Sequence, residues 1–127
     1  MSKLHSSFEF SRTAPGEPLK RSTEGRWIPN TDAWITDHGI VIKVELAGLR
    51  REDLELTMEG NTLRINGQRA DGCRAGSACQ FLIMEISYGE FESVIELPEG
   101  YDLSQARAAY QNGFLRIDVP RASGPGL

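Results

Sequence analysis

The chain has 127 residues, of which 39% are hydrophobic and 25% are charged, and its net charge is −4 at pH 7. These values indicate one globular domain that is long enough to bury a core. No basic stripe interleaves with aromatic residues, which argues against nucleic-acid binding, and no apolar run reaches the roughly 20 residues of a membrane-spanning helix. Because the first residues lack the apolar block of a signal peptide, we expect a cytoplasmic protein without membrane contacts.

Residues 1–26 are rich in Ser, Arg, Gly and Pro and show neither helical nor strand periodicity. The stretches "TAPGEP" and "STEGR" are typical of flexible linkers. We therefore predict a flexible N-terminal arm that carries two phenylalanines, Phe8 and Phe10. Two interpretations of these rings stay open: they are arm residues without a role, or they contact another protein.

From Trp27 onward, short segments alternate between apolar and polar side chains, and turn residues separate them at regular intervals. This pattern predicts an all-β fold, an immunoglobulin-like antiparallel β-sandwich over residues 27–120, followed by a short tail at 121–127. Only the segments 50–54 and 103–107 suit a short helical turn. The apolar faces of the expected strands are Ile40, Ile42, Val44, Leu46; Leu54, Leu56, Met58; Leu63, Ile65; Phe91, Ser93, Ile95, Leu97; and Leu115, Ile117, Val119.

The stretch "AAYQNGFLRIDVP" (108–120) predicts a tight hairpin near the end of the domain. Asn112 and Gly113 form the strongest two-residue turn signal, because both central positions of a type I′ turn need positive φ. The strand after the turn ends at Pro120, which has no backbone N–H to donate. On the strand before the turn, Ala108 and Tyr110 share one face, where the small alanine allows close backbone approach.

The segment "QFLIMEIS" (80–87) is apolar on both faces, unlike the other expected strands. A strand of this kind at a free sheet edge would invite aggregation. Two explanations stay open: it is a central strand buried on both sides, or the long connection 69–89 carries it to the sheet of a partner chain.

Two cysteines, Cys73 and Cys79, lie six residues apart in a Gly/Ala-rich stretch. A bridge, a metal site and two unreacted thiols are all compatible with this spacing. A metal would need further ligands, and the histidines, His5 and His38, lie far away in the sequence. We therefore expect two free thiols in a reducing cytoplasm.

The sequence offers no catalytic constellation. A Ser-His-Asp arrangement cannot be assembled from one histidine in the arm and one in a turn. Carboxylates such as Glu45, Glu55 and Glu59 alternate outward along strands and form solvated faces. No phosphate-binding loop of the Walker type occurs. We expect no enzyme activity, no metal and no cofactor.

Five motifs, in order, resemble the α-crystallin domain of bacterial small heat-shock proteins over about residues 27–120. They are "WIPNTD" (27–32), "VELAGLRREDLEL" (44–56), with Ala47 where proline is usual, "TLRINGQR" (62–69), "SYGEFESVIELPEG" (87–100), and Ala108, Asn112, Gly113 and Leu115 of the hairpin. The resemblance implies an ATP-independent holdase that binds unfolding client proteins under stress and forms at least a homodimer.

The resemblance also implies which residues make contacts. Pairing of segment 80–86 with a partner would involve Trp34, Ile35, Phe81, Leu82, Ile83 and Met84. Clients would bind in a groove beside Leu54, Leu56, Met58, Ala108 and Tyr110, or at Phe8 and Phe10. For the groove residues a second explanation stays open, namely that most of them belong to the core. The groove would stand open or would be filled by the chain's own N-terminus.

Two departures from the family pattern modify these expectations. Ile83, Ile86 and Ser93 stand where arginines are usual, so we expect dimerisation to depend little on salt. The stretch "RASGPGL" (121–127) lacks the Ile-x-Ile tail of many members, so we do not expect large cages built through that tail. Two other classes remain as alternatives: a p23-like co-chaperone, typically monomeric, and a secreted immunoglobulin-like adhesion domain, which would need a signal peptide and a paired core cysteine.

Overall fold

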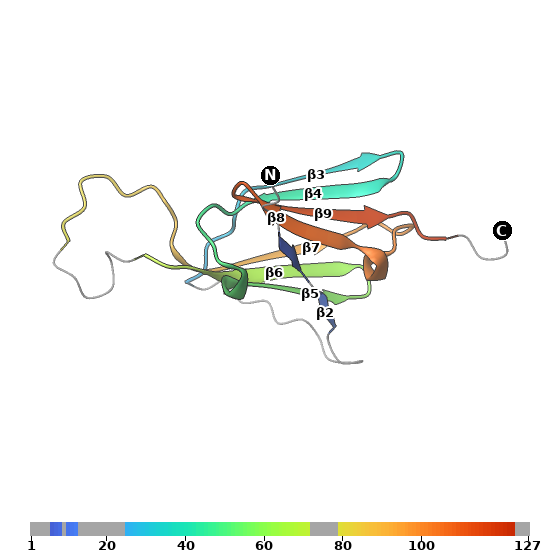
Figure 1. Ribbon diagram of the computed structural model, residues 1–127, viewed down its shortest axis with the longest axis horizontal. Coiled ribbons are helices and arrows are strands. Elements are labelled where there is room, and N and C mark those ends of the chain that lie inside the picture. Colours follow the sequence, from blue (N-terminus) through green and yellow to red (C-terminus); the bar gives the residue numbers. More distant parts are fainter. Residues whose placement is uncertain (1–5, 9, 13–24, 72–78, 124–127) are drawn as a thin grey trace.

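The structure, a computed structural model, describes residues 25–71 and 79–123, and the backbone of residues 6–8 and 10–12. It is the two-layer β-sandwich that the alternating pattern predicts (Figure 1). The strands are β1 (Ser6–Phe8), β2 (Phe10–Arg12), β3 (Thr31–Thr36), β4 (Gly39–Glu45), β5 (Leu54–Glu59), β6 (Thr62–Arg69), β7 (Gly89–Glu96), β8 (Arg107–Gln111) and β9 (Phe114–Pro120).

One sheet has the strand order β1-β8-β9-β4-β3 and the other has the order β2-β5-β6-β7. All neighbouring strands are antiparallel except β2 and β5, which run parallel. Short turns join β3 to β4, β5 to β6 and β8 to β9 within a sheet, and a long connection joins β6 to β7. The connections from β4 to β5 and from β7 to β8 cross between the layers.

The core lies between the sheets and consists of the inward faces expected from the alternation. Ile42, Val44, Leu63, Ile65 and Leu115 are fully buried. Since side chains of a strand alternate between faces, the registers Ile42↔Ile117 and Ile65↔Ser93 bring these inward sets into one layer. Burial of these aliphatic groups supplies the main stabilisation of the fold.

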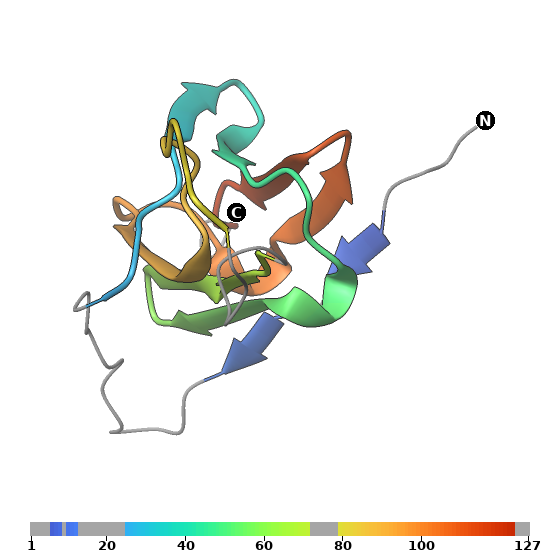
Figure 2. The same cartoon turned by 90° about the vertical axis from the view of Figure 1, so that its left-hand side faces the viewer.

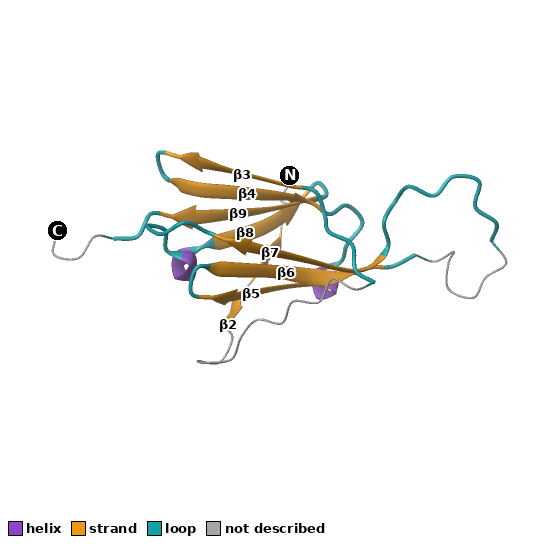
Figure 3. Cartoon of the chain, turned by 180° about the vertical axis from the view of Figure 1, so that it is seen from behind, coloured by secondary structure: helices purple, strands orange, loops and turns teal. Residues whose placement is uncertain are grey.

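The hairpin between β8 and β9 has the expected turn. Asn112 has φ 55° and Gly113 has φ 83°, and Gln111 pairs with Phe114 across the turn. The two segments expected to form helical turns do so as single 3₁₀ turns, η1 (Arg51–Asp53) and η2 (Leu103–Gln105), coloured purple in Figure 3. No helix within the described ranges is long and apolar enough to cross a membrane.

The N-terminal arm differs from the unstructured segment that we expected, because it contains β1 and β2. Ser6–Phe8 pairs with Ala108–Tyr110 of β8, and Phe10–Arg12 pairs with Leu56–Met58 of β5. Figure 2 shows these two short blue strands running along the side of the sandwich where β5 and β8 form the sheet edges. The physical reason is the exposed backbone of an edge strand, which accepts any extended segment as a further strand. Such pairing requires no side-chain periodicity.

Residues 79–88 contain no strand in this single chain. The explanation that this segment is a buried central strand is therefore wrong: Leu82 is 96% exposed and Ile83 is 76% exposed. The segment belongs to the long connection between β6 and β7, which extends away from the sandwich (Figure 1).

Candidate interaction surfaces

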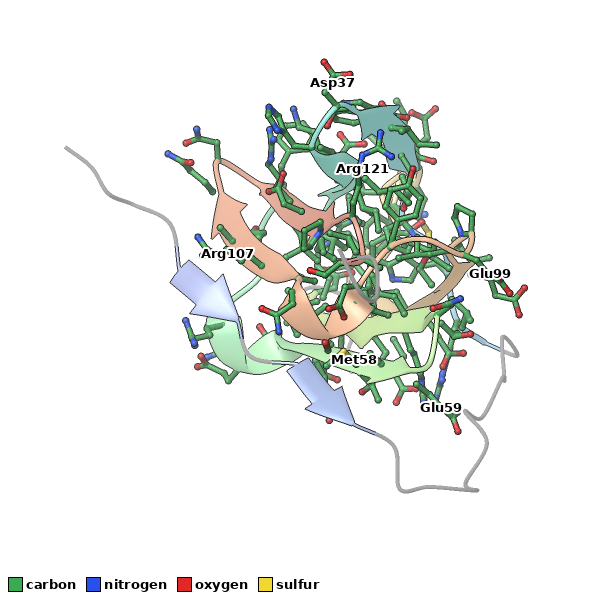
Figure 4. All side chains as sticks on the ribbon, turned by 90° about the vertical axis from the view of Figure 1, so that its right-hand side faces the viewer. Asp37, Met58, Glu59, Glu99, Arg107 and Arg121 are labelled. Atoms are coloured by element: carbon green, nitrogen blue, oxygen red, sulfur yellow. The ribbon has the colours of Figure 1, made fainter. Side chains whose placement is uncertain are left out.

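The first candidate surface is called the β5–β8 groove, after the groove expected there. It is the side of the sandwich where β5 and β8 are the last strands of the two sheets before the arm strands β2 and β1. In this chain the arm covers it. In the strand registers, Phe8 is the partner of Ala108 and Phe10 is the partner of Leu56. The arm therefore pairs with one sheet up to residue 8 and with the other sheet from residue 10. In Figure 4, β1 lies beside Arg107 of β8 and β2 lies beside Met58 of β5.

The apolar residues expected to line this groove are buried. Leu54, Leu56, Met58 and Ala108 all belong to the core cluster, with exposed fractions of 9% or less. In the chain whose arm is paired with β5 and β8, these four residues are therefore core residues, as the second explanation for them stated. Tyr110 is half-buried, packs against the same cluster and lies in register with Ser6 of the arm.

The second candidate surface is the apolar strip of residues 81–86. Its side chains are exposed to an extent unusual for hydrophobic groups: Phe81 is 43%, Met84 60% and Ile86 59% exposed. A contiguous apolar surface of this kind marks an interaction site more often than scattered single residues do. A small hollow of about 230 Å³ is lined by Phe81, Ile83, Met84, Glu85, Ile86 and Tyr88.

The third candidate surface is the free edge of β3. Within the described residues, β3 pairs with β4 on one side and with no strand on the other. Trp34 and Ile35 are 41% and 61% exposed, and they lie in register with Val41 and Ile40. The single chain thus presents the two sets of residues expected at a dimer interface on separate elements, one as an apolar strip and one as an open sheet edge.

The edge of the other sheet, at β7, is covered at its start by an isolated bridge between Trp27 and Phe91. The Trp27 backbone nitrogen donates to the Glu90 oxygen at 3.1 Å, and the Glu92 nitrogen donates to the Trp27 oxygen at 3.1 Å. The Trp27 ring packs against Phe91, with the ring centroids 5.1 Å apart. A residue just before β3 thus pairs with the start of β7, whereas no strand among the described residues lies on the outer side of β3.

A buried carboxylate on β7 was not predicted from the sequence. Glu92 is only 2% exposed, although it lies on the outward face of its strand. Its carboxylate oxygens lie 2.6 Å from Arg64 Nε and 3.4 Å from Arg26 Nη1. The signal that would have found it is the diagonal pairing of positions 64 and 92 on the outer face, which appears only once the β6–β7 register is known. The cluster is a structural tie between the arm's end and the sheet.

The expectation of two free thiols is wrong for Cys79, which is disulfide-bonded. The chain's other cysteine, Cys73, lies outside the described residues. The bond lies in the connection that leads to the apolar strip.

Some charged side chains on the surface of the sandwich have partners within the chain. The Arg50 side chain donates to Asp53 and thereby holds the pKa of that carboxyl below its ordinary value. At the end shown in Figure 4, Arg121 donates to the backbone oxygen of Asp37 at 3.2 Å. Among the residues that the structure describes, no three His, Cys, Asp or Glu side chains are grouped to hold a metal ion. The three candidate surfaces can therefore bind another chain through apolar contact and strand pairing.

Comparisons with known proteins agree with this arrangement. The Hsp20/alpha crystallin family matches residues 32–125. Small heat shock protein C2 of Rickettsia felis is 32% identical over 104 residues, which cover 82% of this chain and 67% of the relative. Spore protein SP21 of Stigmatella aurantiaca is 30% identical over 95 residues, covering 75% of this chain and 56% of the relative.

Solved structures give the same result for the fold. The small heat-shock protein of Xylella fastidiosa, described as having a distinct high order structure, has a TM-score of 0.71 at 25% identity, covering 80% of this chain and 93% of the other. For the hspA of Xanthomonas axonopodis the TM-score is 0.68 at 28% identity, covering 76% and 95%. The chain spans 56% to 67% of the length of the first three curated relatives it matches.

Proposed function

Since the chain belongs to the Hsp20/alpha crystallin family of small heat-shock proteins, whose members are chaperones, we propose that it acts as an ATP-independent holdase in the cytoplasm. It would bind unfolding proteins and keep them from aggregating under stress. A holdase must bind unfolded chains and ignore folded ones, so it needs apolar surface that is covered until a client appears.

One observation carries the proposal: the arm covers the β5–β8 groove through two ladders of only three residues each. Ladders this short give little stabilisation on their own, so the arm can dissociate from β5 and β8 at a small cost in free energy. Its departure would free the edges of β5 and β8 and uncover Leu56, Met58 and Ala108. Phe8 and Phe10 would leave with it and become available to the same clients.

We further propose a homodimer in which residues 80–86 add to the β3 edge of a second copy. The side chains of the strip are largely exposed, and within the described ranges β3 has no strand on its outer side. Strand addition would satisfy the edge and bury the apolar side chains together. Because residues 83 and 86 are both Ile and are exposed, apolar contact would dominate this interface. Ser93 is buried in its own chain and lies outside this interface.

The experiment that tests the function is a client-aggregation assay without nucleotide, with light scattering on the same samples to give the assembly mass. We expect suppression at near-stoichiometric ratios and a mass of at least two chains. A monomer without protective activity would favour the second candidate, a p23-like interaction module. A dimer without protective activity would contradict the holdase proposal and leave the interface standing.

A further inference from the structure

Arg69, the last residue of β6, joins three segments of the chain through one guanidinium group. Its Nε and Nη2 donate to the backbone oxygen of Ser87 at 3.0 and 2.7 Å. Its Nη1 donates to the backbone oxygen of Ala47 at 3.0 Å. The start of the long connection is therefore fixed to its own end, and both are fixed to the turn after β4.

Two aromatic rings hold the same guanidinium. Its central carbon lies 4.5 Å from the centroid of the Trp27 ring and 5.6 Å from that of Tyr88. Trp27 is itself held, because its Nε1 donates to the backbone oxygen of Gly89 at 3.2 Å. Only arginine combines a planar cation that stacks on rings with a fork of donors, so lysine cannot replace it here.

This arrangement defines the base of the connection that carries the apolar strip. Arg69 and Ser87 are 18 positions apart in sequence, yet one side chain holds them within hydrogen-bond distance. Ile86, the last residue of the strip, directly precedes Ser87. Without this clamp, both the position and the direction in which the strip leaves the sandwich would vary.

We propose that Arg69 is a positioning residue for dimerisation, which orients residues 81–86 toward the β3 edge of a second copy of this chain. The inference rests on the proposed dimer and adds the residue that lowers the dissociation constant of that dimer. Holding a segment in the direction needed for binding reduces the conformational entropy lost on association, and this gain appears directly in the dissociation constant. Arg69 itself need not touch the partner.

The test is Arg69→Lys in the full chain, with the dimer dissociation constant measured by sedimentation over a dilution series. Lysine keeps the charge and loses the fork and the stacking plane. We expect the dissociation constant to rise about tenfold. Arg116→Lys is the matched control, since Arg116 is an exposed arginine that pairs with Asp118, and it should leave the dissociation constant unchanged. An unchanged constant for Arg69→Lys would overturn the proposal.

A second pair of variants leaves every contact of Arg69 in place. Two glycines inserted between Ile86 and Ser87 separate the strip from the clamp, whereas two inserted between Ala70 and Asp71 lie on the far side of the strip. We expect the first insertion to weaken the dimer about as much as Arg69→Lys does, and the second to weaken it far less. Equal effects would contradict the positioning role. A wild-type chain that stays monomeric at all concentrations would instead remove the proposed dimer on which the inference rests.

Discussion

The hydroxyl of Tyr110 donates a hydrogen bond to the backbone oxygen of Leu46 at 2.6 Å and accepts one from the backbone nitrogen of Leu49 at 3.4 Å. The residue expected to face a client therefore ties β8 to the connection between the two sheets. Tyr110→Phe removes both bonds and keeps the ring, so we expect a loss of about 1 kcal/mol in the free energy of unfolding. Urea denaturation measures it. An unchanged midpoint would mean that the hydroxyl does not stabilise the folded chain.

Gly113→Val tests the hairpin turn between β8 and β9. Gly113 has φ 83°, and a Cβ at this position would lie 3.2 Å from the Cβ of Ala47. A β-branched residue resists positive φ, so we expect a destabilisation of more than about 1 kcal/mol, read as a lower melting temperature. Gly60→Val is the control, because Gly60 has φ 58° with no atom within 4 Å of its would-be Cβ. Its effect should be smaller. Equal losses would show that the contact with Ala47 adds nothing.

The sequence predicts those parts of the molecule that depend on side-chain periodicity. Leu115, Ile117 and Val119 alternate, and they are buried as a set. The arm strands have no such signal, because β1 and β2 are only three residues long and backbone pairing at a sheet edge needs no alternating pattern. The burial of Glu92 could not be predicted from the sequence either, because it depends on two arginines from distant positions in the chain. Sequence patterns therefore located the sheets, and backbone pairing at their edges had to come from the structure.

Phe81→Asp tests the proposed dimer interface. Phe81 lies at the start of the apolar strip and is 43% exposed in the single chain. If the partner's β3 edge covers it, a carboxylate there would be desolvated, so we expect light scattering to give a mass shifted toward monomer. The wild-type dimer should change little between low and high salt.

Phe114→Asp is the control for this experiment. Phe114 is 37% exposed, and it lies on β9, two strands away from the free edge of β3, with Lys43 Nζ 4.3 Å from its ring centroid. It should leave the dimer mass unchanged. A full dimer of Phe81→Asp would exclude residues 81–86 as the contact.

Arg50→Gln tests the ion pair at the turn before β5. The hydrogen bond from the Arg50 side chain lowers the pKa of Asp53. A carboxyl whose folded pKa is depressed contributes stability above its unfolded pKa, and this contribution is lost as the pH falls through the folded value. We expect Arg50→Gln to raise the pKa of Asp53 toward its ordinary value in an NMR titration, and Arg116→Gln to leave it unchanged. An unmoved pKa in the first variant would mean that backbone donors alone hold the carboxylate.

Removal of residues 1–26 tests the role of the arm in client protection. Two contributions oppose each other in this variant: the β5–β8 groove loses its cover, and Phe8 and Phe10 are lost as client contacts. We expect weaker suppression of client aggregation, because an arm that carries two aromatic rings adds apolar area that adapts to many clients. The sandwich should still fold, since the strands β3–β9 and the core cluster lie outside the deleted segment. The melting temperature should fall, because the deletion also removes Arg26 from the buried Glu92.

The double variant Phe8→Ser, Phe10→Ser separates these two contributions. It keeps the backbone that pairs with β8 and β5 and removes only the rings, so it should reproduce much of the loss seen on deletion. The readout is client light scattering at fixed ratios, with circular dichroism to show that the sandwich is intact.

If the truncated chain protects as well as the full chain, or better, the arm is only a cover. The groove formed by Leu54, Leu56, Met58, Ala108 and Tyr110 would then be the surface that holds the client. If no form of the chain protects any client, the holdase proposal fails with it.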